Sequence, residues 1–188
     1  RFEGPPNLVG YPPLRGGAIQ GSGDGLVVED CSFARCRAVE GGAIHSTNQP
    51  VTLTRVRIEA NCSASYHGGA LWLDGGPVQI DDCELRGFAL YGAGGVAYFA
   101  GGSASILRTS LAGSSFDGGG AIYTSAAVLS LRDCDVTGSS REDYYGGGLH
   151  QATGDLVVDS STLHDCSAIR GGAIWSQGGT LQIVDSSF

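Results

Sequence analysis

The sequence predicts an all-β solenoid, because two motifs recur in phase along its 188 residues. A glycine pair begins at positions 16, 41, 68, 94, 119, 146 and 171, and an alternating apolar triplet begins ten residues after each pair. Together the motifs define seven units of 25 to 27 residues. Repeats of this length that bury an apolar face against their neighbours are typical of solenoids.

Each unit contains three expected strands, in which apolar residues alternate at period two and no helical spacing is sustained. The first strand follows the glycine pair and carries the column Ile19, Ile44, Leu71, Ala97, Ile122, Leu149 and Ile174. The second is the triplet, with the column Val28, Leu53, Ile80, Ile106, Leu131, Val158 and Ile183. The third carries the column Phe33, Ile58, Leu85, Leu111, Val136, Leu163 and Phe188. Stacked like residues predict a right-handed, single-stranded parallel β-helix of about seven coils.

The expected β-helix covers residues 16–188, and residues 1–15 are expected to be a lead-in or the tail of a preceding coil. Glycine pairs explain much of the total of 32 glycines, because glycine permits turns and close approach of neighbouring coils. Phe188 falls in the column of Phe33, so the seventh coil is incomplete. We therefore expect the rod to continue, or another subunit to cover its C-terminal edge.

The repeat resembles that of the polymorphic outer membrane proteins of chlamydiae, in which GGA[IL] precedes a strand and an F-x-x-N element. GGAI or GGAL occurs at Gly41, Gly68 and Gly171, among other copies. The first letter of F-x-x-N is kept as an apolar residue, whereas its last letter is Asn only at Asn61 and is otherwise Cys36, Phe88, Ser114, Ser139 or Cys166. The resemblance implies the β-helical region of a secreted or surface-displayed adhesin-like protein, without catalytic residues.

Composition limits the partners. The net charge is −8, there is no cluster of basic residues, and no apolar run approaches the length of a membrane span. We therefore expect no nucleic-acid partner, no membrane insertion by this segment and an extracellular or cell-surface location. No cofactor or metal site is expected.

One column alternates in charge, with Asp30, Arg55, Asp82, Arg108 and Asp133 in successive coils. Opposite charges on adjacent strands attract, whereas a shifted register would oppose like charges. The column is interpreted as a device that fixes register, and the interleaved arginines argue against a Ca²⁺ or acid/base cluster.

Five of the six cysteines fall into two groups. Cys31, Cys83 and Cys134 share one inward column two coils apart, about 9.6 Å, which is too far for a disulfide. They are interpreted as small buried hydrophobes. Cys36 and Cys62 lie in adjacent coils and form the candidate disulfide.

Aromatic residues form a row one position after the first buried column. This aromatic row consists of His45, Trp72, Tyr98, Tyr123, His150 and Trp175. Strand alternation points it away from the core, toward solvent or a partner. Two interpretations remain open: the rings stack on one another and stabilise the sheet, or they present a face that binds protein or glycan.

The length variation of the repeat is confined to the segment before each glycine pair, which predicts loops at one corner of the solenoid. The second candidate site consists of Tyr66, His67, Tyr91, Arg141, Glu142, Asp143, Tyr144 and Tyr145. The alternative interpretation is that these loops vary in length and sequence without a binding role.

The predicted function is non-catalytic: a structural or adhesin-like β-helix that binds protein or glycan as part of a longer chain or assembly. A carbohydrate-active enzyme, resembling polysaccharide lyases or hydrolases, is the alternative of another class. Its candidate groups are Asp81 and Asp82 with Arg108, and Arg141 with Glu142 and Asp143. Neither group recurs in a second strand with suitable partners.

Overall fold

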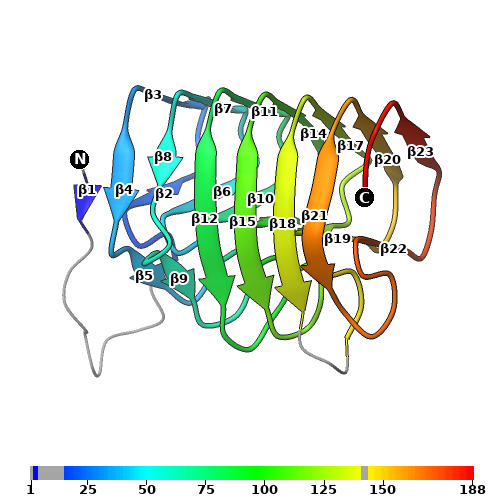
Figure 1. The fold of residues 1–188 in the computed structure, drawn as a ribbon. Coiled ribbons are helices and arrows are strands. Elements are labelled where there is room, and N and C mark those ends of the chain that lie inside the picture. The colour runs from blue at the N-terminus through cyan, green and yellow to red at the C-terminus, as the bar shows by residue number, and fades with distance from the viewer. Residues whose placement is uncertain (1, 4–14, 141–143) are drawn as a thin grey trace.

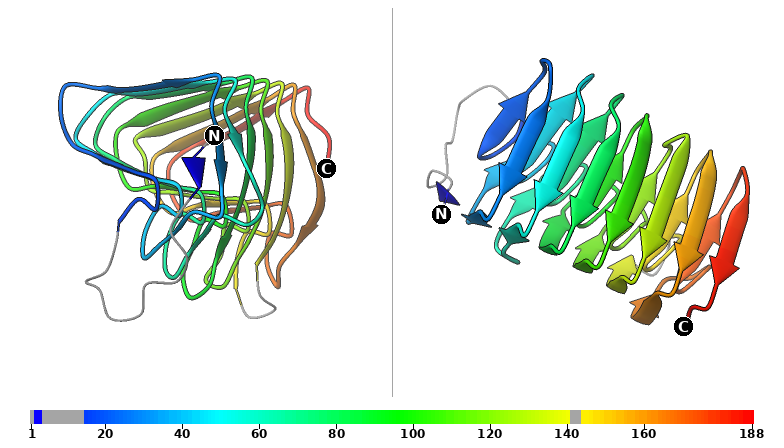
Figure 2. Two further views of the ribbon diagram at one scale, coloured as in Figure 1. Left: turned by 90° about the vertical axis from the view of Figure 1, so that its left-hand side faces the viewer. Right: turned by 90° about the horizontal axis from the view of Figure 1, so that it is seen from above.

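The structure is a computed structural model that describes residues 2–3, 15–140 and 144–188. The chain forms a rod of stacked coils, and all regular elements in these ranges are β-strands (Figure 1). Viewed from the N-terminal end, successive coils lie behind one another and the chain runs clockwise as it recedes, which is a right-handed coil (Figure 2). The expected parallel β-helix is therefore confirmed.

Three parallel sheets run along the rod, and each coil contributes a strand to each sheet. The first sheet contains β2 (Ile19–Gly21), β6 (Ile44–Thr47), β10 (Leu71–Asp74), β13 (Ala97–Phe99), β16 (Ile122–Thr124), β19 (Leu149–Gln151) and β22 (Ile174–Ser176). The second contains β3 (Leu26–Glu29), β7 (Val51–Thr54), β11 (Val78–Asp81), β14 (Ser103–Leu107), β17 (Val128–Arg132), β20 (Asp155–Asp159) and β23 (Leu181–Val184).

The third sheet contains β1 (Phe2–Glu3), β4 (Ser32–Ala34), β8 (Arg57–Ile58), β12 (Glu84–Ala89), β15 (Ser110–Ser115), β18 (Asp135–Ser140) and β21 (Thr162–Ser167). Two short strands, β5 (Arg37–Ala38) and β9 (Ser63–Ala64), pair beside it. Six coils are complete, and the seventh consists of β22, β23 and a single bridge from Ser187 to Thr162.

The three predicted apolar columns form the core. Ile44, Leu53 and Ile58, one from each sheet in the same coil, are completely buried. Ile19 and Ile174 in the edge strands β2 and β22 are only partly buried, because each has a neighbouring strand on one side only. One continuous apolar cluster therefore runs through the stack.

The glycine pairs serve the turn into the first sheet, as predicted. Gly41 has a φ of 62°, a conformation that is strained for other residues. A Cβ atom on Gly42 would lie 2.0 Å from the carbonyl oxygen of Gly69 in the next coil. The first glycine therefore permits the turn and the second permits the close stacking of coils.

Part of the expected lead-in pairs with the rod. Strand β1 is parallel to β4 and aligns Phe2 with Phe33, so it occupies the place of a third strand before the first complete coil. Residues 4–14 of the lead-in lie outside the described residues.

The last letter of F-x-x-N forms a structural column only in part, because strand pairing aligns Phe88, Ser114 and Ser139 but not Cys36 and Asn61. Phe88 pairs with Ser63, and Ser63 pairs with Arg37, so Cys36 and Asn61 both precede this register. The cause is local extra chain, because Arg35 adopts a φ of 55° before β5 and a turn at residues 60–61 precedes β9. The alignment of Cys36, Asn61 and Phe88 in the sequence was therefore wrong.

Candidate functional site

The aromatic row forms in the predicted register on the outer face of the first sheet. Strand pairing aligns Gln20, His45, Trp72, Tyr98, Tyr123, His150 and Trp175. Adjacent strands lie about 4.8 Å apart, a spacing at which flat rings can stack.

The rings of the row stack on one another. The His45 and Trp72 centroids are 4.3 Å apart with an interplanar angle of 2°, and those of Tyr98 and Tyr123 are 4.7 Å apart at 7°. Trp72 and Tyr98 are 6.4 Å apart and nearly parallel. The stack is interrupted only at His150, whose ring is tilted by 60° from that of Tyr123.

Corner residues cover much of this stack. The His67 ring is 4.8 Å from that of Tyr98, and the Tyr145 ring is stacked 4.8 Å from that of Trp175. His45 is only 2 % exposed and His150 only 6 %. The larger rings Trp72, Tyr98, Tyr123 and Trp175 are partly exposed. The mutual stacking of the rings, together with the burial of the two His rings, favours the interpretation of the row as a structural stack over that of an open binding face.

Burial also changes the proton affinities of the row. It lowers the pKa of His45 below its ordinary value, although Glu40, with Oε2 3.5 Å from His45 Nε2, opposes the shift. Burial likewise lowers the pKa of His150 and of His67, and it raises the pKa of Tyr98 to about 12. The row is therefore held in its neutral form at neutral pH.

The second predicted site divides into two parts. His67 and Tyr145 pack against the rings of the aromatic row. Tyr66 and Tyr91, by contrast, are 52 % and 58 % exposed at the corner, and their ring centroids are 6.3 Å apart. Tyr144 lies beside Phe116 in the following part of the same corner, 5.5 Å from ring to ring. The predicted residues Arg141, Glu142 and Asp143 lie outside the described residues.

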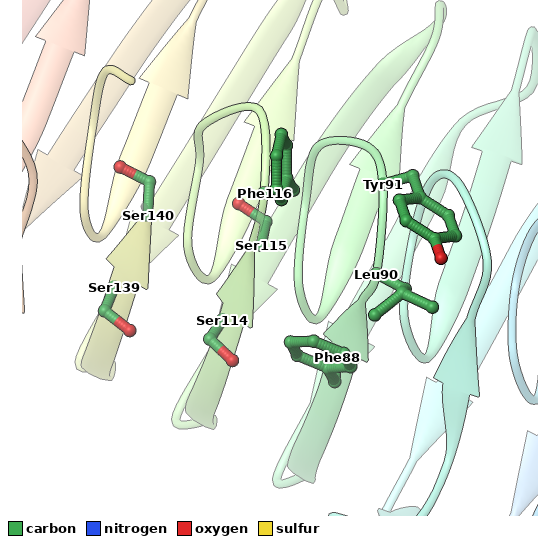
Figure 3. Close-up of a pocket in the computed structure, with 8 residues that line it drawn as sticks. All are labelled: Phe88, Leu90, Tyr91, Ser114, Ser115, Phe116, Ser139 and Ser140. Carbon is green, nitrogen blue, oxygen red and sulfur yellow. The ribbon is translucent and has the colours of Figure 1, made fainter. Parts of the chain in front are cut away.

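A cavity of about 430 Å³ lies at this corner, where β12, β15 and β18 end (Figure 3). Apolar and hydroxyl side chains line it: Phe88, Leu90, Tyr91, Ser114, Ser115, Phe116, Ser139 and Ser140. Of these residues, only Tyr91 was among the predicted site residues. The sequence did contain a signal for the cavity, because the apolar residues Phe88 and Leu90 alternate with the inward positions that follow buried Leu85 and are therefore exposed. This signal was overlooked because Phe88 was assigned to the Asn position of the repeat.

The serines of the cavity are aligned across two coils, with Ser114 beside Ser139 and Ser115 beside Ser140. The Ser115 hydroxyl donates to the Gly118 carbonyl oxygen at 2.9 Å. The buried Ser140 Oγ has no hydrogen-bond partner among the described residues. The cavity thus places polar groups next to exposed rings.

Cys36 and Cys62 are neighbours in adjacent coils, as the candidate disulfide requires. Both side chains are completely buried, and the Cys36 amide donates to Cys62 Sγ at 3.4 Å. Hydrogen bonding with Cys36, together with burial, raises the pKa of the Cys62 thiol. The disulfide itself stays a prediction.

The column of Cys83 and Cys134 has a polar role that the sequence interpretation missed. Cys83 Sγ accepts from the Val56 amide at 3.4 Å and donates to the Asp81 carbonyl at 3.1 Å. Thr109 in the next coil accepts from the Cys83 amide at 3.2 Å. Describing these cysteines only as small hydrophobes was therefore incomplete, because their side chains satisfy backbone groups at the bend between two sheets.

The alternating charge column forms ion pairs at this bend. Arg55 binds Asp30 through two contacts of 2.6 and 2.8 Å, and Arg108 Nε lies 3.1 Å from Asp82 Oδ1. Hydrogen bonding to Arg55 lowers the pKa of Asp30. Every member of the column also has a positive φ, from 45° to 53°, so these charged side chains occupy left-handed bends.

Within residues 2–3, 15–140 and 144–188, no three His, Cys, Asp or Glu side chains are grouped to hold a metal ion. These ranges also contain no helix of the length and hydropathy needed to cross a membrane.

Comparison with protein-family models, curated proteins and solved structures gave no match. The resemblance to the chlamydial outer membrane protein repeat therefore stays a prediction based on the motif.

Proposed function

We propose that this β-helix is a non-catalytic, secreted or surface-displayed rod that binds a protein or glycan through its corner. The observation that carries the proposal is the exposed ring surface of Tyr66 and Tyr91 next to the corner cavity. Solvent-exposed aromatic side chains that cluster on the surface mark an interaction site more often than scattered ones do. The aromatic row, by contrast, serves the stack beneath this surface.

The charges of the rod support binding over catalysis. Asp81 and Asp82, the strongest candidate carboxylates for a polysaccharide-active enzyme, both contact Arg108, with Oδ2 of Asp81 2.5 Å from Nη2. A general acid or base needs a free, convergent carboxylate partner. Asp81 and Asp82 are therefore not free for such a role.

The C-terminal edge is a second proposed contact, with further coils or another subunit as the partner. Leu181, Ile183 and Phe188 are exposed there. Strand β23 pairs with β20 on one side only, so its other edge is available for strand addition.

A pair of double variants tests the corner proposal. Labelled wild-type protein and Tyr66→Ser/Tyr91→Ser protein are applied to a glycan array, purified matrix proteins and cells. The matched control is Val27→Ser/Val128→Ser, which removes two exposed apolar side chains from the second sheet. We expect binding by wild type and control and at least a tenfold loss by the corner variant. Equal binding by all three proteins, or none by wild type, would contradict the proposal.

A further inference from the structure

We infer that the cavity at the ends of β12, β15 and β18 binds a neutral oligosaccharide. The inference rests on the proposed binding function and specifies its site and its ligand class. A volume of about 430 Å³ is in the range of ligand pockets. The cavity can therefore hold about one or two sugar units of a longer chain.

Rings form the apolar part of the site. Phe88 and Tyr91 are exposed, and Phe116 is partly buried between neighbouring coils. Flat ring faces can pack against the C–H faces of pyranose rings, and such contacts remove apolar surface from water, which favours binding. These rings supply the packing energy of the site.

Hydroxyl groups form the polar part. Ser114 and Ser139 are partly buried, and neither side chain is hydrogen-bonded within the described part of the chain. They are aligned on adjacent strands, about 4.8 Å apart, and Figure 3 shows their hydroxyls on the same side. A sugar chain laid along the rod would meet the same donor and acceptor from one coil to the next.

The buried Ser140 adds a second polar feature. Ser140 lines the cavity and is only 7 % exposed. Its Oγ has no hydrogen-bond partner among the described residues. A buried hydroxyl is most stable when it is hydrogen-bonded. A ligand rich in hydroxyl groups suits such a lining better than a purely apolar one does.

The surroundings argue against other occupants. All eight lining residues are uncharged, and the chain carries a net charge of −8, which disfavours an acidic polysaccharide. A peptide cannot bind here by strand addition, because β15 is paired with β12 on one side and β18 on the other. A neutral oligosaccharide matches the rings, the hydroxyls and the charge together.

Calorimetric titration of the whole chain tests the inference. The probes are cellotetraose, maltotetraose, mannotetraose and acetylated chitotetraose, with tetragalacturonate as the anionic comparison. We expect at least one neutral probe to bind. Tyr91→Ser and the double variant Ser114→Ala/Ser139→Ala should each weaken that binding tenfold or more. Val27→Ser and Ser105→Ala, at exposed sites of the second sheet, are the matched controls and should bind as wild type does.

Several results would overturn the inference: no binding of any neutral probe at millimolar concentration, unchanged binding by the cavity variants, or equally tight binding of tetragalacturonate. If neutral probes fail but a protein partner is lost in Tyr66→Ser/Tyr91→Ser, this inference fails and the proposed function stands. If wild type binds neither glycan nor protein, both fail.

Discussion

Cys83 illustrates how one side chain satisfies a backbone group at a bend that recurs along the rod. Asp82 before it adopts a φ of 51°, which turns the chain out of the ladder, and the Val56 amide of the preceding coil then bonds to Cys83 Sγ. Thr109 and Ser161 fill the same place in other coils and accept from the amides of Cys83 and Cys134. In these coils the column carries side chains that can both accept and donate a hydrogen bond, whereas Val56 at the same place in the second coil packs as an apolar side chain.

A substitution pair at Cys83 tests this role. Cys83→Ala leaves the buried Val56 amide without a partner and should lower the free energy of unfolding by about 1–3 kcal/mol. Cys83→Ser keeps a hydroxyl at nearly the same place and should be no less stable than wild type. Chemical denaturation of the three proteins measures the difference. Equal losses for Ala and Ser would show that only the volume of the thiol matters.

At the scale of the element, the first sheet is stabilised on both faces, by the apolar column inside and by the ring stack outside. Each stacked ring pair contributes roughly 0.5–1.5 kcal/mol beyond burial. His45 and His150 take part as neutral rings, since burial lowers the pKa of each. The stack therefore links the stability of the sheet to pH.

The sign of this linkage follows from the direction of the shifts. The folded-state pKa values of His45, His67 and His150 lie below the ordinary value of 6.5. Below about pH 6.5 the unfolded chain takes up protons that the folded chain does not, so the free energy of unfolding should fall as pH falls toward the folded-state values. His164, exposed beside Asp165, has a raised pKa and acts in the opposite direction.

Denaturation midpoints between pH 7.5 and pH 5 measure this effect. Wild type should lose stability as the pH falls, and His150→Gln should show a shallower dependence because one titrating ring is gone. His164→Gln is the exposed control and should not flatten the curve. A wild-type midpoint that rises toward pH 5, or an unchanged slope in His150→Gln, would contradict the prediction.

The same sheet shows how far the sequence predicts the site. Register, ring order and the buried column were correct, because a period-two pattern repeated in every unit leaves little freedom. The covering of the row by His67 and Tyr145 could not be read from the pattern, because corner length varies and corner side chains have no fixed period. The cavity was missed because Phe88, which lines it, was assigned to the Asn position of the repeat.

At the scale of the whole molecule, the rod depends on regular repetition for stability and on irregularity for function. Three sheets and a continuous core follow from columns that were visible in the sequence. Extra residues displace Cys36 and Asn61 from the register of Phe88. They could not be recognised in the sequence, because a bulge changes the spacing of a motif without changing the composition. The exposed rings gather at the corner, where the spacing varies.

The central claim is that the aromatic row stabilises the rod whereas the corner rings serve binding. The thermal unfolding midpoint of two variants tests it directly. Trp72→Ser/Tyr98→Ser/Tyr123→Ser, which removes three stacked rings, should lower the midpoint by roughly 10 °C or more. Tyr66→Ser/Tyr91→Ser should change it by no more than about 2 °C. A midpoint that is unchanged in the row variant, or lowered as much in the corner variant, would contradict this division of roles.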